Sequence, residues 1–209
     1  MRTWIFVAMM AALAFMTTNP AGAQEKTARM IVYVAGNHIA TNDILFDYAN
    51  SMNLGDIEKL GEAHPTDMVR YTDLIPLLPS ALKGWSADTP EGLNMEVSGV
   101  KYSFAENTYH KTAAEDEVTV LIWDTVNQEK GPWYAFWYGQ KMSFETDDAY
   151  ARTKEVKGYP AWEYRDKKQN EGWLGIGLVM ATPVPEMGNL ILIVPALLSA
   201  GIIARKMRP

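Results

Sequence analysis

The residues of this chain that could carry acid–base or metal chemistry are few and lie far apart. There are three histidines, His38, His64 and His110, and none has another histidine two, three or four positions away. A zinc site needs such ligands to converge in the fold, so we interpret these histidines as exposed residues of loops or strand edges. The chain has no cysteine, which excludes disulfides, thiolate catalysis and cysteine-ligated metal sites together.

Carboxylates are the other possible source of chemistry. Two acidic clusters, 115–117 and 147–148, could offer oxygens to Ca²⁺, but neither has the alternating spacing of a calcium-binding loop, and we interpret them as solvated turns. Glu106 and Asp124 are a candidate pair for hydrolysis across neighbouring strands. No nucleophile-elbow, phosphate-loop, dinucleotide-binding or zinc-protease motif occurs in the sequence. We therefore predict no catalytic residue, no metal site and no cofactor.

The most unusual segment is an aromatic run between two glycines, 131–139. It contains Trp133, Tyr134, Phe136 and Trp137. Exposed aromatic side chains stack on sugar faces or fill the pockets of a partner, which makes these four residues the candidate binding site. The alternative is that they face the core and cover the sheet.

The elements that must position these residues change in type along the chain. Apolar residues at helical spacing predict helices over 44–52, after an Asn42–Asp43 cap, and over 67–75. A β-branched run at 30–34 is a candidate first strand, and from residue 85 onward the apolar period changes to two. We expect about six strands there, at 93–97, 100–109, 118–123, 153–156, 161–164 and 172–180. Helices followed by hairpin strands predict an α+β fold, an antiparallel sheet of about six strands with the N-terminal helices on one face.

The composition and charge favour a globular, acidic domain. Apolar residues make up 48% and charged residues 21% of the chain, so its middle can bury a core. All 25 acidic residues lie within 24–186, where the net charge is 15 − 25 = −10. An acidic surface repels phosphate backbones, so we predict that nucleic acid is not a partner.

The N-terminus has the pattern of a secretory signal peptide. Arg2 precedes an apolar run over 4–16, and a helix breaker follows it. Ala21 and Ala23 supply the small residues that signal peptidase needs at −3 and −1, so Gln24 is the predicted first mature residue. The alternative is an uncleaved membrane anchor, for which this run is short, since the hydrocarbon layer is about 30 Å thick.

The C-terminus has the pattern of a membrane-spanning tail. Residues 187–204 are uncharged and mostly apolar, which is long enough to span a bilayer. Arg205, Lys206 and Arg208 follow, and the positive-inside rule predicts that this basic end stays in the cytoplasm. The domain before the tail then lies outside, on the side to which a signal peptide delivers it. The alternative is a buried helix at the end of a soluble domain.

The residues at the start of this tail carry a family resemblance. Val184, Pro185 and Glu186, then Met187, a short spacer, an apolar helix and a basic terminus resemble the PEP-CTERM class of sorting signals. The tail is similar to the PEF-CTERM variant of archaeal surface proteins, with Met187 where Phe or Pro is usual. The resemblance implies that an exosortase or archaeosortase, a membrane transpeptidase, cuts near the Pro-Glu motif and transfers the protein to an anchor. A plain single-pass anchor is the alternative.

These patterns together predict four parts. They are a signal peptide over 1–23, an exported α+β domain over 24–180, a Pro-rich linker over 181–186 and a transmembrane sorting or anchor tail over 187–209. The predicted function is that of an exported protein, anchored in the cell membrane or at the cell surface, whose domain binds or supports without catalysis. Two alternatives stay open, an extracytoplasmic carboxylate-dependent hydrolase and an accessory subunit of a membrane complex.

Overall fold

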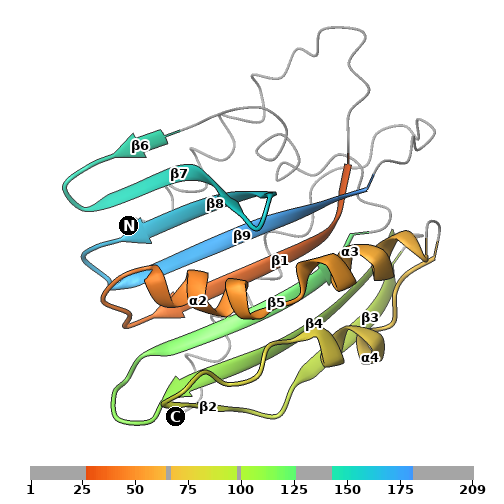
Figure 1. Cartoon of the computed structure of the whole chain (residues 1–209), viewed down its shortest axis with the longest axis horizontal. Coiled ribbons are helices and arrows are strands. Elements are labelled where there is room, and N and C mark those ends of the chain that lie inside the picture. The colour runs from red at the N-terminus through yellow and green to blue at the C-terminus, as the bar shows by residue number, and fades with distance from the viewer. Residues whose placement is uncertain (1–26, 65–66, 98–99, 126–142, 181–209) are drawn as a thin grey trace, which may run out of the picture.

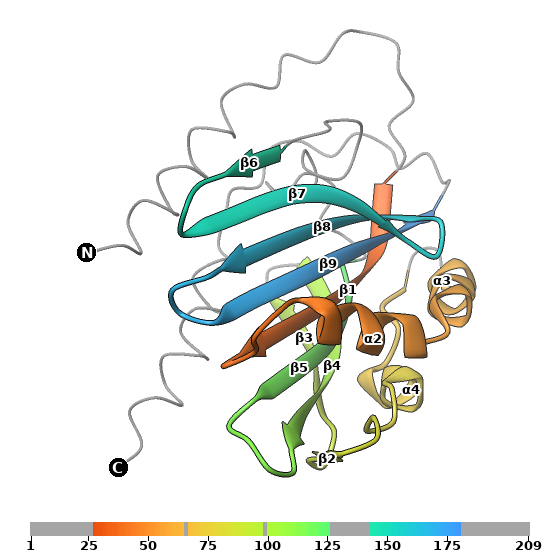
Figure 2. The ribbon, with the colours of Figure 1, turned by 60° about the vertical axis from the view of Figure 1, so that its left-hand side comes forward.

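The described part of the chain is an antiparallel sheet with helices on one face. The computed structural model describes residues 27–64, 67–97, 100–125 and 143–180. The α-helices among them all lie on the same side of the sheet in both views (Figure 1 and Figure 2). This confirms the predicted α+β class and the antiparallel sheet. Among these residues no helix is long and apolar enough to span a membrane, and the predicted signal peptide and C-terminal tail lie outside them.

Some strands that follow one another in the chain are also neighbours in the sheet, whereas β1 lies between β5 and β9. The helical elements are α2 (Asp43–Ser51), α3 (Leu54–Glu62), α4 (Tyr71–Leu74) and the 3₁₀ turn η1 (Ile75–Leu77). The strands are β1 (Thr27–Asn37), β2 (Trp85–Ala87), β3 (Glu91–Val97), β4 (Val100–Lys111), β5 (Glu117–Asp124), β6 (Ser143–Glu145), β7 (Ala149–Val156), β8 (Tyr159–Asp166) and β9 (Glu171–Met180). Their order is β2-β4-β5-β1-β9-β8-β7-β6, and β3 also pairs with β4. Every pairing between these strands is antiparallel.

The described sheet has nine strands rather than the expected six or so. The candidate strand at 30–34 is part of β1, which joins the same sheet as the later strands. The other two additions, β2 and β6, have three residues each. A run that short shows no alternation of apolar and polar residues, so periodicity could not predict it.

The first strand lies at the centre of the sheet, between β5 and β9. Met30, Val32 and Val34 alternate along β1 and are fully buried under the helices. Ile31 and Tyr33 point to the opposite face, because successive residues of a strand alternate in direction. The sheet is therefore built on both sides of its N-terminal strand.

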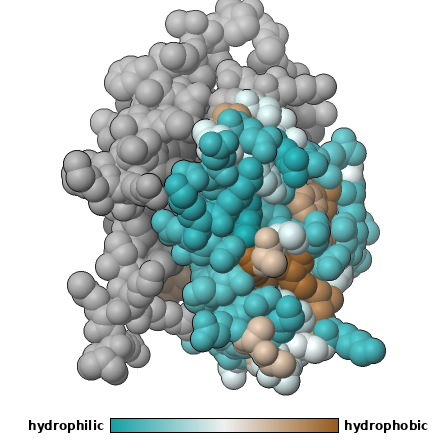
Figure 3. Space-filling view, turned by 90° about the vertical axis from the view of Figure 1, so that its left-hand side faces the viewer, coloured by the Kyte–Doolittle hydropathy of each residue, from teal (hydrophilic) through white to brown (hydrophobic). Residues whose placement is uncertain are grey.

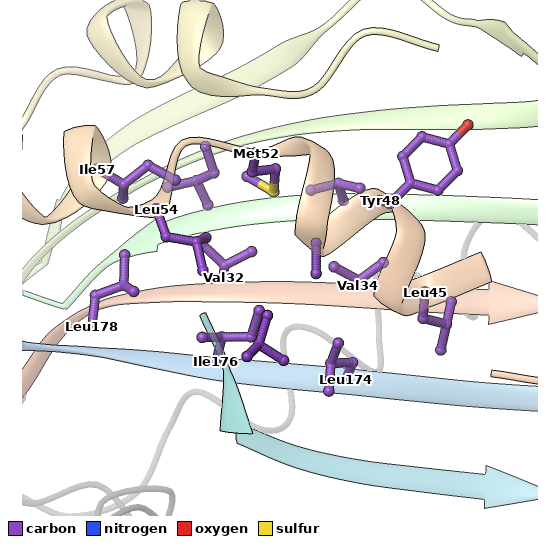
Figure 4. Close-up of a cluster of buried hydrophobic side chains, with 14 of the residues drawn as sticks. Val32, Val34, Leu45, Tyr48, Met52, Leu54, Ile57, Leu174, Ile176 and Leu178 are labelled. Carbon is purple, nitrogen blue, oxygen red and sulfur yellow. The ribbon is translucent and has the colours of Figure 1, made fainter. Parts of the chain in front are cut away.

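The hydrophobic core lies between the helices and the central strands (Figure 4). Leu45 and Tyr48 of α2, and Leu54 and Ile57 of α3, have at most 1% of their surface exposed. Burying each such side chain contributes about 1.5–3 kcal/mol. Tyr48 also packs edge-on against Trp85 of β2, with 5.8 Å between ring centroids, so the core reaches the edge of the sheet.

The helix expected over 67–75 is shorter than its apolar pattern suggests. Only α4 is α-helical, and η1 follows it with Pro76 near its start. The residues just before Tyr71 are not helical and instead contact the sheet, where the backbone N–H of Val69 donates to the carboxylate of Asp124 at 2.8 Å. The segment is held extended against the sheet, and this long-range bond has no signature in the local sequence.

Candidate functional site

Arg29 of β1 and Asp124 of β5 form a buried ion pair. Nε of Arg29 lies 2.8 Å from Oδ1 of Asp124, and Nη2 lies 2.9 Å from Oδ2. The side chains are 8% and 0% exposed. Two parallel N–H···O bonds of this kind are the strong, geometrically specific form of an arginine–carboxylate contact.

The same pair holds the segment that leads into α4. The guanidinium of Arg29 also donates to the backbone carbonyls of His64 and Asp67. Asp124 accepts the backbone N–H of Val69 on Oδ2. Three donors and complete burial commit this carboxylate to joining β1, β5 and the segment before α4.

The candidate carboxylate pair Glu106 and Asp124 does not form. In the pairing of β4 with β5, Asp124 lies opposite Ser103 and Glu106 lies opposite Leu121. Glu106 comes three positions after Ser103, which is an odd step along the strand, so Glu106 points to the other face of the sheet. The prediction of this pair is wrong because it had the right neighbouring strands but no information on their register.

A second buried ionic cluster surrounds Glu163 of β8, which is 1% exposed. Its carboxylate accepts hydrogen bonds from Asn42 Nδ2 at 3.0 Å, from the Tyr150 hydroxyl at 2.7 Å and from Arg152 Nε at 2.7 Å. Burial opposes ionisation of Glu163, but the bonds from Arg152, Tyr150 and Asn42 outweigh it and hold its pKa below the usual value. Glu163 is therefore a carboxylate with fixed partners on both oxygens.

The Glu163 cluster ties the start of α2 to the outer strands. Asn42, the cap residue of α2, makes no cap bond with its side chain and instead donates to the carbonyl of Tyr164 at 2.9 Å. Arg165, 4% exposed, donates to the carbonyls of Ile39 and Ala40 at 2.7 and 3.1 Å. The loop between β1 and α2 is thus fastened to β8 by polar side chains.

Among the histidines, His110 of β4 has the most charged surroundings. Its Nε2 lies 3.2 Å from Oδ2 of Asp88, and its Nδ1 lies 3.8 Å from Oε2 of Glu117. The two carboxylates approach opposite ring nitrogens, so they do not converge on one point. His38 lies elsewhere, with Nδ1 3.3 Å from the carbonyl of Glu115. No group of three His, Asp or Glu side chains in the described part of the chain could hold a metal ion.

The two acidic clusters lie at hairpin ends. Asp116 pairs with Lys111 at 3.0 Å, and Asp148 pairs with Lys168. Such surface ion pairs contribute about 0–1 kcal/mol. The coloured residues on the side of the molecule shown in Figure 3 are mostly hydrophilic, around a smaller hydrophobic patch.

The sheet face away from the helices gathers aromatic side chains from five strands. Register places these residues, which we call the aromatic face, on that side: Tyr33, Phe104, Trp123, Trp162, Tyr164 and Trp173. The ring of Trp173 lies 5.7 Å from the rings of both Tyr33 and Tyr164. The row therefore crosses β1, β9 and β8 without a break. Aromatic residues at alternate strand positions are the sequence signal that could have revealed it.

Comparisons with protein-family models, with curated proteins and with solved structures find no match for this chain. The predicted cleavage residues Ala21, Ala23 and Gln24 lie outside the described residues. So do the sorting motif, the basic C-terminal residues and the aromatic segment 131–139.

Proposed function

We propose that this chain is an exported, membrane- or surface-anchored protein whose domain is a non-catalytic binding or structural module. The proposal that the domain is non-catalytic rests on the structural role of Asp124 and Glu163. Each of these buried carboxylates is bonded to groups from separate chain segments. A general acid or base must reach the proton it transfers, whereas these two groups join parts of the fold.

The proposal that the protein is exported and anchored is supported by the ends of the sequence and by the pairing of β1 with β9. The patterns at 1–23 and 187–209 are those of a signal peptide and of a sorting or anchor tail. Thr27 pairs with Met180, so the chain enters and leaves the sheet at the same end. A domain of this kind can be anchored through its C-terminal tail alone. We propose that an exosortase- or archaeosortase-type transpeptidase recognises this tail.

The location is tested by the intact mass of native protein extracted from membranes. We expect loss of residues 1–23, and loss of the tail after about Glu186 together with an added lipid mass. A protein that has lost residues 1–23 but keeps 187–209 would show that the tail is a plain membrane anchor and that no sortase cuts it. A full-length mass at both ends, or recovery only from the cytosol, would overturn the proposal.

The non-catalytic role is tested by the sign of a stability change. Removal of a catalytic carboxylate commonly raises stability, because active sites are kept at a cost to it. We expect Asp124→Asn and Glu163→Gln to lower the melting temperature, with Glu155→Gln, an exposed change on β7, as the control. A higher melting temperature for either variant would favour the hydrolase.

A further inference from the structure

Two glycines of β9 leave a strip of the aromatic face without side chains. Gly175 lies between Tyr33 of β1 and Trp162 of β8, and Gly177 lies beside Ile31 on the same face. Both glycines are buried, although no described helix lies on this side of the sheet (Figure 2). Glycine inside a strand often marks a place where another backbone approaches closely.

The connection between β5 and β6 begins and ends at the end of the sheet where Gly177 lies. Because all pairings are antiparallel, β5 ends and β6 begins at the same end of the sheet, with β1, β9, β8 and β7 between them. Neighbouring strands are about 4.8 Å apart, so the two points are separated by about 24 Å. Residues 126–142 connect them, and at about 3.3–3.6 Å per residue an extended chain of that length reaches well beyond this distance. The connection is long enough to cover the sheet as well as to cross it.

The helix face is already occupied at this end. There α3 packs on β9 and β1, and Ile57 lies close to Leu178 (Figure 4). Leu54 and Ile57 are buried in that contact. At β1 and β9, therefore, the aromatic face is the one that α3 leaves uncovered.

We propose that the segment 131–139 docks on the aromatic face, with its rings over the strip at Gly175 and Gly177. The segment has no charged residue, so it brings no charge of its own to an aromatic face. Aromatic side chains bury about 150–250 Å² each and pack edge-to-face or offset with one another. Tyr33 is half-buried, and desolvation raises the pKa of its hydroxyl above its usual range.

Single-cysteine labelling tests the proposal, since the natural chain has no cysteine. Thr153 lies opposite Trp162 on the aromatic face, and Lys154 is exposed on the other face. The variants Thr153→Cys and Lys154→Cys are made in the full chain and in a full chain whose 131–139 is replaced by a Gly/Ser linker of equal length. We expect a thiol reagent to label Thr153→Cys at least about tenfold more slowly than Lys154→Cys, and the difference to vanish with the linker.

Other outcomes identify other occupants. Equal labelling of both positions in the natural segment would overturn the proposal. Protection of Thr153→Cys that grows with protein concentration would assign the face to a second copy, and protection only in lipid vesicles would assign it to a membrane. Should the linker chain not fold, Phe136→Ser and Trp137→Ser must each speed the labelling of Thr153→Cys, and unchanged rates would overturn the proposal.

Discussion

Arg29 Nε lies 2.8 Å from Asp124 Oδ1, and this contact joins residues 95 positions apart. Met30, the neighbour of Arg29, is the register partner of Asp124, so the ion pair lies where β1 and β5 meet. Both side chains are buried. Either one left alone would be a charge without a partner in a poorly solvated place, which is much costlier than the loss of a surface pair.

We therefore predict that Asp124→Asn destabilises the domain strongly. The variant leaves Arg29 without its counter-charge, and breaking a buried pair in this way costs about 3–5 kcal/mol. Urea denaturation measures the change in the free energy of unfolding. The double variant Arg29→Met, Asp124→Leu removes both charges and is expected to be more stable than Asp124→Asn. Additive losses from the two positions would mean that they do not act as a pair.

The cluster around Glu163 predicts a loss of stability in acid. The pKa of Glu163 is lowered in the folded protein, so the stabilisation is complete above the pKa of the unfolded chain and is lost as the pH falls through the folded value. The denaturation midpoint should fall as the pH drops below about 4.5, the ordinary value.

A matched pair of variants separates Glu163 from the other acids. Glu163→Gln keeps the size of the side chain but removes the negative charge to which Arg152 and Tyr150 donate hydrogen bonds. We expect it to lower the free energy of unfolding by about 2–3 kcal/mol near neutral pH. It should also flatten the acid dependence, whereas Glu155→Gln, at an exposed position of β7, should change neither. An unchanged acid slope in Glu163→Gln would contradict the role given to this cluster.

Tyr159 predicts a loss of stability in alkali. Its hydroxyl donates to Glu58 of α3 at 2.6 Å, and this bond, with burial, raises its pKa to about 12. The stabilisation is complete below the unfolded pKa of about 10 and is lost as the pH rises through about 12. Tyr159→Phe should cost about 1 kcal/mol at pH 7, measured by urea denaturation, and this difference should disappear above pH 12. A constant difference across that range would exclude the hydrogen bond as its cause.

The parts of the fold that could be predicted from sequence are those with a local pattern. Residues 118–123 form a nearly continuous apolar run and lie in β5, and the hairpin expected from 93–97 and 100–109 is formed by β3 and β4. Helix α3 was missed because Gly55 and Gly61 interrupt its pattern. Gly61 is in fact buried.

The clusters could not be predicted because they depend on register and long-range contact. Arg29 and Asp124 meet only once β1 is placed beside β5, and Glu163 meets Asn42 only once α2 reaches β8. A shift of register by one residue moves every side chain to the other face. That is why Glu106 seemed a partner of Asp124 when only the neighbouring strands were known.

Gly172 and Asn42 provide a test of how tightly α2 is fastened to the sheet. A Cβ built on Gly172 would lie 2.1 Å from Oδ1 of Asn42 and 3.1 Å from the carbonyl oxygen of Tyr164. Asn42 cannot move aside without losing its bonds to Glu163 and Tyr164. We predict that Gly172→Ala costs about 2–4 kcal/mol, from overpacking together with lost hydrogen bonds.

Gly158→Ala is the control for this variant. Gly158 has φ +85° and no atom within 4 Å of an added Cβ, so its substitution costs only the strain of the left-handed conformation, about 1–2 kcal/mol.

Combining Gly172→Ala with Asn42→Ala removes the obstructing amide, so the double variant should lose less than the sum of the two single changes. Urea denaturation of the four proteins in this cycle measures the difference. A strictly additive loss would show that the cost at position 172 does not come from Asn42, and the fastening of α2 would then have to lie in Arg165 and its bonds to Ile39 and Ala40.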